Sequence, residues 1–383
     1  MIVFIKRTNI DNLLCDPFLS MSRPGKNNRM AHNRANARDD NESVIQLWRF
    51  LLPRLRRNVS THKHQQPDRT EITLDDRSFI IKSDFSDLAS GAGAYAVYAL
   101  ANALACYGGE PKSCWATRFL PPDMNPDQQP NASLDAIGHA CKMLNLTWQG
   151  EQVRTLDGLT QPLLASYMLA AATPDNRCVP QNIKPDDRLI LTTNLATAAT
   201  ALIAHIHEAE LAKAFDLRFA QRCRRLFNEN DLNLVPAAKI AGKIQGIHAM
   251  QDLFEISLAN ALHMMMDASA LDVEIDLAQI DLLPEAKVVC EHFGLAPLGL
   301  IAPGALVIAG EREACDALLN RYRLAKVPAK IIGQVLKTGE GRWLVEGAER
   351  TRLPHYHTDE LMKLPVLLED KPGVAPQQPQ IPA

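Results

Sequence analysis

The stretch that decides the fold contains four segments in order: GIHAMQD (246–252), DVEID (272–276), CEHFGLAPL (290–298) and APGALVIA (302–309). Short apolar runs bounded by glycine, proline or aspartate are typical of buried strands. Longer runs with apolar residues at helical spacing lie between them. This alternation predicts an α/β domain in which helices cover a sheet.

The same alternation extends over the second half of the chain and predicts one domain at residues 186–365. Its start follows a linker-like stretch at 174–187, and residues 366–383, with four prolines, should be a flexible tail. The remaining predicted elements of this domain are strands at 189–191, 330–335 and 343–345 and helices at 195–212, 214–227, 235–242, 253–268, 284–293 and 311–325.

The first half predicts a second α/β domain at residues 71–185. Its clearest element is a helix at 92–107 built mainly from Ala, Leu, Val and Tyr, whose small residues allow close approach to a sheet. Gly108, Gly109 and Pro111 end that helix. The other predicted elements are strands at 78–82, 112–120 and 163–172 and a helix at 134–144.

Residues 1–70 differ from the rest in charge. They hold 13 Lys and Arg against 6 Asp and Glu, whereas the remainder holds 28 against 38. We expect a basic, largely disordered extension with one amphipathic helix at 43–57, capped by Ser43. That helix could rest on a membrane surface or a partner. We favour docking onto its own domain, because apolar helix faces usually bury locally.

Several classes of protein are excluded by what the sequence lacks. Eight scattered cysteines contain no C-x-x-C pair, which argues against a disulfide scaffold or a structural zinc site. No apolar run is long enough to span a membrane, and no signal peptide is recognisable. Neither a P-loop nor a dinucleotide-binding fingerprint occurs. The sequence predicts a cytoplasmic protein that binds no nucleic acid.

In order and spacing, the four segments of 246–309 resemble the C-terminal domain of the aminoimidazole-ribonucleotide synthase superfamily, and within it the group similar to the hydrogenase maturation protein HypE. The segment VPAKIIGQV (327–335) is similar to that family's closing strand. In the first half, KSD (82–84) resembles a strand ending in a magnesium-binding acid, and ANALACYGGEP (101–111) resembles the family's Asn-Asp helix.

This resemblance implies a two-domain α/β fold, ATP bound between the domains with Mg²⁺, and a homodimer formed through the first domain. Carried onto this sequence, it implies that Asp84 and Asp252 hold the cation and that Asn102 orients a phosphate. Each residue also has a structural alternative. Asp84 could cap a strand end, Asp252 could be the N-cap of the next helix, and Asn102 could be a buried amide.

The sequence also departs from the family pattern. Ala103 stands where the Asn-Asp pair has its carboxylate, and LFEIS (253–257) replaces a Pro-Thr turn with two glycines that approaches phosphate. Two functions therefore stay open. One is an ATP- or nucleotide-dependent HypE-like enzyme of a maturation or biosynthetic pathway, which activates a C–O group by phosphoryl transfer. The other is an inactive relative that serves as a dimeric binding or assembly scaffold for a protein partner.

Overall fold

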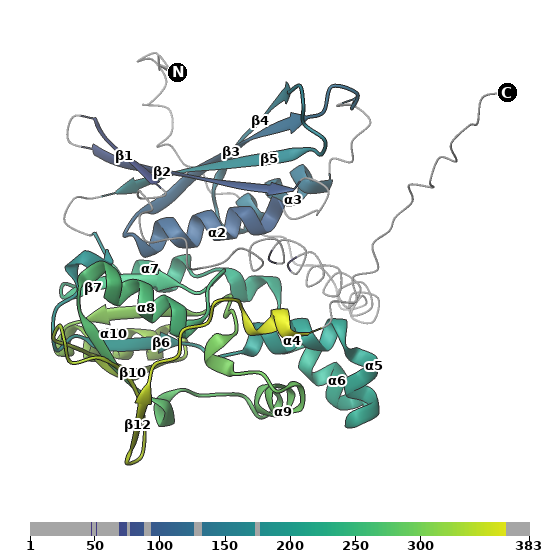
Figure 1. Ribbon diagram of the computed structural model, residues 1–383. Coiled ribbons are helices and arrows are strands. Elements are labelled where there is room, and N and C mark those ends of the chain that lie inside the picture. The colour runs from purple at the N-terminus through teal and green to yellow at the C-terminus, as the bar shows by residue number, and fades with distance from the viewer. Residues whose placement is uncertain are drawn as a thin grey trace, which may run out of the picture. The chain divides into compact units, whose positions relative to one another are not determined.

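The computed structural model describes Leu47, Leu51 and residues 69–74, 77–87, 93–125, 132–172 and 177–364. In these residues the chain forms two sheets with helices packed on them, which confirms the predicted mixed α/β class (Figure 1). The predicted tail at 366–383 and most of the predicted extension at 1–70 lie outside the described residues. The domain bounds of 71–185 and 186–365 stay a prediction.

The first sheet has the strand order β1-β2-β5-β3-β4. Only β3 and β4 run parallel; the other neighbours are antiparallel. Helices α2 and α3 lie along one face of it (Figure 1). The elements are β1 (Arg69–Leu74), β2 (Arg77–Asp87), α2 (Gly93–Cys106), β3 (Glu110–Leu120), α3 (Ala132–Met143), β4 (Thr147–Thr155) and β5 (Leu163–Ala172).

The second sheet has the order β12-β11-β8-β10-β6-β9-β7, and only β11 and β8 pair in parallel. Its strands are β6 (Arg188–Thr192), β7 (Ile247–Asp252), β8 (Asp272–Asp276), β9 (Leu306–Gly310), β10 (Ala329–Leu336), β11 (Arg342–Glu346) and β12 (Glu349–Arg352). Its helices are α4 (Thr197–Ile206), α5 (Glu208–Ala214), α6 (Leu217–Arg224), α7 (Val235–Ala241), α8 (Leu258–Ser269), α9 (Pro284–Phe293) and α10 (Arg312–Ala325). Five short 3-10 turns are η6 (Pro180–Asn182), η7 (Glu229–Leu232), η8 (Leu277–Gln279), η9 (Pro297–Gly299) and η10 (Glu360–Lys363).

Both faces of the second sheet are covered. One apolar core joins its strands to α8, and another joins the opposite face to α7 and α10. Residues such as Leu189 and Ile190, adjacent in β6, therefore enter different cores, as alternation along a strand requires. Ala105 and Cys106 at the end of α2 belong to the second of these cores.

The structure bears on two predictions, one about the N-terminal region and one about the cysteines. Leu47 and Leu51, one helical turn apart, are both helical and no more than 1% exposed, and they share a core with α2. This supports docking of the predicted 43–57 helix onto its own chain.

The described cysteines are all buried free thiols: 106, 114, 141, 178, 223, 290 and 315. Among the described residues, no helix is long and apolar enough to cross a membrane.

Two helix predictions need correction. The helix expected at 253–268 begins only at Leu258, because Ser257 is its N-cap and accepts the N–H of Asn260. The helix expected at 195–212 is broken at His207, which separates α4 from α5. Three strands were not predicted from the sequence, namely β1, β4 and β12.

We expect Gly333→Ala to lower the free energy of unfolding by about 2–4 kcal/mol. Gly333 lies at an irregularity in the pairing of β10, where an added methyl group would clash with the carbonyl oxygen of Glu274. Urea denaturation followed by circular dichroism measures the change.

Gly138→Ala in α3 is the matched control, because a methyl group there would meet nothing within 4 Å. It should be neutral or stabilising by up to about 1 kcal/mol. Equal losses in both variants would contradict the close-approach explanation.

Candidate functional site

Asn102 connects α2 to the chain segment that precedes α7. It is 0% exposed. Its Nδ2 donates to the carbonyl oxygen of Leu232 at 2.7 Å, and its Oδ1 accepts the N–H of Leu234 at 2.9 Å. The side-chain oxygen and one N–H are therefore occupied by backbone groups. This geometry favours the buried-amide alternative over the predicted contact with phosphate.

Asp252 is the last residue of β7, and it lies beside the end of α2. Burial, followed by the charge of Asp252, raises the pKa of the Cys106 thiol well above its ordinary value. Oδ1 of Asp252 accepts the N–H of Phe254 at 3.2 Å, so the carboxylate holds the turn that leaves the strand. The alternative role of Asp252 as a helix N-cap is wrong, because Ser257 caps α8.

The turn after Asp252 is filled with apolar side chains. Leu253 is 0% exposed and Phe254 is 1% exposed. Phe254 belongs to the same core as Phe227, which precedes η7, and Leu232, the last residue of η7. The first two residues of the segment that replaces the family's Pro-Thr turn are therefore packed in the core. Ile256 and Ser257, which stand at the positions of the family's two glycines, are half-buried and buried, and Glu255 between the two pairs is exposed.

Asp84 lies in the middle of β2, opposite Ser166, on the face that also carries Ile80. Ile80 sits next to Gly109, just beyond the end of α2. Four residues of strand separate Asp84 from Ile80, which is about 13 Å. Asp84 therefore lies about 13 Å along β2 from the residue that contacts the chain just after α2. No group of three or more His, Cys, Asp or Glu in the described part of the chain could hold a metal ion.

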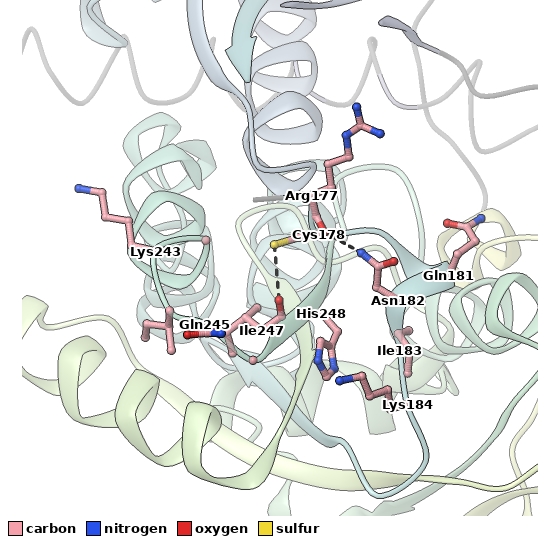
Figure 2. Close-up of a pocket in the computed structure, with 13 residues that line it drawn as sticks. Arg177, Cys178, Gln181, Asn182, Ile183, Lys184, Lys243, Gln245, Ile247 and His248 are labelled. Atoms are coloured by element: carbon pink, nitrogen blue, oxygen red, sulfur yellow. Dashed lines mark hydrogen bonds between the residues drawn. The ribbon is translucent and has the colours of Figure 1, made fainter. Parts of the chain in front are cut away.

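A hollow of about 740 Å³ lies at the other end of β7. Five residues of strand, about 17 Å, separate Ile247 at its edge from Asp252. Two segments far apart in the sequence form its wall: Arg177, Cys178, Gln181, Asn182, Ile183 and Lys184 from the chain before β6, and residues 242–248 from the turn between α7 and β7 (Figure 2).

His248 on this wall is held by a buried carboxylate. Its Nδ1 lies 2.8 Å from Oδ2 of Asp187, which is 2% exposed and also accepts the N–H of Lys184. Nε2 of His248 lies 3.5 Å from Glu311, which accepts a 3.0 Å bond from the Lys184 ammonium. That bond lowers the pKa of Glu311. Asp187 therefore fixes the ring orientation, with Nδ1–H donating to the carboxylate.

Cys178 is part of the wall but is not a reactive group. Its Sγ lies 4.0 Å from the carbonyl oxygen of Ile247, and burial raises its pKa to about 11. At neutral pH it is therefore a thiol, the poorly nucleophilic form.

Sequence reasoning missed the hollow as a whole. Residues 177–184 read as a linker, and 242–248 as the end of a helix and the start of a strand. The available signal was the density of cationic and amide side chains around Gly242 and Gly246, which is unusual for the start of a buried strand. Nothing in the linear order indicated that the two segments meet.

The fold of the second half of the chain corresponds to a known class of domain. Residues 184–346 match the family "AIR synthase related protein, C-terminal domain", so this part of the chain is a domain of that kind. The chain is 32% identical to carbamoyl dehydratase HypE of Escherichia coli over 127 residues, which are 32% of this chain and 38% of that relative. It is 23% identical over 264 residues to a Methanocaldococcus jannaschii protein named for hydrogenase expression and formation, covering 65% and 71% of the two chains.

Solved structures of hydrogenase maturation protein HypE share the fold over most of both chains. HypE in complex with ATP matches with a TM-score of 0.59 and 15% identity, covering 88% of this chain and 97% of that one. HypE in its complex with HypF matches with a TM-score of 0.58 and 14% identity, covering 78% and 98%. The implied two-domain fold is thereby confirmed.

We expect Asn102→Ala to lower the free energy of unfolding by about 2–3 kcal/mol, because it leaves the carbonyl of Leu232 and the N–H of Leu234 buried without partners. Denaturant titration measures this loss. Asn320→Ala, at an exposed position of α10, is the control and should change stability by less than about 0.5 kcal/mol. A neutral Asn102→Ala would remove the structural role assigned to the amide.

Proposed function

We propose that this chain is a HypE-like, AIR synthase-related protein that acts in a maturation or biosynthetic pathway. The observation that carries the proposal is the AIR synthase-related domain at 184–346 within a fold that spans nearly the whole length of HypE. A cytoplasmic location remains part of the proposal. Two modes of action are open, and a different observation supports each.

The first mode is an ATP- or nucleotide-dependent enzyme that activates a C–O group by phosphoryl transfer. It is supported by the existence of an ATP complex of HypE and by the name of the relative, a carbamoyl dehydratase. Asp252 lies at the end of β7, before the segment that stands in place of the family's phosphate turn. The backbone-bonded amide of Asn102 does not fit a contact with phosphate in this arrangement, so no catalytic step follows from it.

The second mode is an inactive relative that binds or assembles partners. The packed side chain of Phe254 and the occupied amide of Asn102 support it, because both remove room or donors from the nucleotide position. A solved HypE structure is a complex with HypF, which is consistent with a protein partner for a HypE-like chain.

A homodimer through the first sheet is part of either mode. One face of this sheet is covered by α2 and α3, whereas the other carries large apolar side chains that are 37–58% exposed. Strand register places them together with the stacked pair Trp115 and Tyr167. These exposed residues are Ile72, Leu74, Phe85 and Leu163. An apolar surface of this kind is typical of a subunit interface.

We expect any Mg²⁺-dependent binding of ATP to be lost in Asp252→Ala and retained in Asp84→Ala, because Asp252 ends β7 whereas β2 continues past Asp84 to Asp87. Isothermal titration calorimetry with and without Mg²⁺ measures this. Asp316→Ala, on the exposed side of α10, is the control.

The first mode fails if the folded protein gives no binding heat with ATP at about 1 mM. A dissociation constant of about 1 mM corresponds to a binding free energy near −4 kcal/mol. The second mode would then account for the protein. Loss of binding in Asp84→Ala alone would instead show that the nucleotide lies elsewhere than at the end of β7.

We expect Phe85→Glu to weaken self-association at least about tenfold, since it places a charge in an apolar interface at a cost above about 1.4 kcal/mol. Sedimentation velocity over a concentration series measures the change. Leu324→Glu is the matched control, because Leu324 is 83% exposed on α10, away from the first sheet. A monomeric wild-type protein would rule out the dimer.

A further inference from the structure

The hollow at the amino end of β7 is separate from the position at which the proposed function needs a nucleotide. About 17 Å of strand lies between them. Its volume of about 740 Å³ is within the range of small-molecule sites, about 300–1,000 Å³. An inference about the hollow therefore does not rest on the proposed function.

The wall of the hollow carries cationic and amide side chains and no carboxylate. Arg177, Lys184, Lys243 and His248 supply the positive or ionisable groups. Figure 2 shows Lys184 and His248 next to each other, while Arg177 and Lys243 come from separate segments. The carboxylates that meet these groups, Glu71, Asp187 and Glu311, are not part of the wall. A ligand would therefore meet donors and positive charge.

The cationic side chains of the wall differ in whether they already form an ion pair with a carboxylate. Arg177 is paired with Glu71, and Lys184 is paired with Glu311 at 3.0 Å. Among the residues that the structure describes, Lys243 has no ion-pair partner. Lys243 is therefore the cation whose charge is available to a ligand without breaking an existing pair.

The neutral groups of the wall add further donors. The amide side chains of the wall are Gln181, Asn182 and Gln245. Among these three, only Asn182 donates a hydrogen bond to another residue of the wall, to the carbonyl oxygen of Arg177 at 2.9 Å. Gly246 has φ +92°, a backbone conformation that favours glycine, at the turn into β7. His248 is already oriented by Asp187.

We propose that this hollow is a binding site for a small oxyanion-bearing molecule, whose anionic group the cationic side chains of the wall attract and whose polar groups its amides bind. Phosphate and carboxylate share the required chemistry, because both accept charge-assisted hydrogen bonds from Lys and Arg. Attraction between a partly exposed cation and an anion is screened by salt, so the binding weakens as ionic strength rises.

The test uses the full-length protein and inorganic phosphate, with acetate in a parallel titration to separate a phosphate site from a carboxylate site. Calorimetry at low ionic strength compares the wild type with Lys243→Gln and Arg177→Gln. Lys287→Gln, an exposed lysine on α9, is the matched control. A thermal melt of each variant establishes that it is folded.

We expect the wild type to bind at least one of the two anions. The affinity should fall at least about tenfold in Lys243→Gln, because this variant loses one charge-assisted hydrogen bond. Binding should be unchanged in Lys287→Gln and in Asp252→Ala, and the last variant separates this site from the proposed nucleotide position. The proposal is overturned if neither anion binds at about 1 mM. It is equally overturned if the folded Lys243→Gln binds as tightly as the wild type.

Discussion

The burial of α2 between the two sheets is the constraint on which the rest of the described structure depends. Twelve of its 14 residues are buried, and its neighbours include β2, β3 and β5 of the first sheet and α7 and β7 of the second. Alanines make up much of the helix, so both sheets can approach it closely. The buried side chain of Asn102 joins the helix to Leu232 and Leu234, since its Nδ2 donates to the carbonyl oxygen of Leu232 and its Oδ1 accepts the N–H of Leu234.

This packing explains why the two ends of β7 differ in chemistry. At the carboxyl end, Asp252 meets the end of α2, and the following turn places Phe254 in the core. At the amino end, the turn from α7 and the chain before β6 leave a polar hollow. Leu253 and Phe254, which follow this carboxyl end, are part of the protein interior. The open, charged surface lies at the amino end instead.

The helices and central strands could be predicted from the sequence because their apolar residues repeat at the period of a helix or a strand. The three strands that were missed, β1, β4 and β12, are all at sheet edges. Their residues are mostly exposed and polar, so the alternation of apolar residues that marks a strand is weak or absent in them. Pairing with a neighbouring strand, which is a non-local interaction, determines them. The late start of α8 has a local cause, the cap at Ser257.

The sequence by itself determined the α/β class, the order of the elements and the relationship of 184–346 to AIR synthase-related domains, because these depend on local periodicity and on motif order. Only the tertiary structure decided that Asn102 is a backbone-bonded amide and that residues 177–184 and 242–248 share one hollow. Each of these depends on contacts between residues that are distant in the chain, and such contacts leave no periodic trace in the sequence.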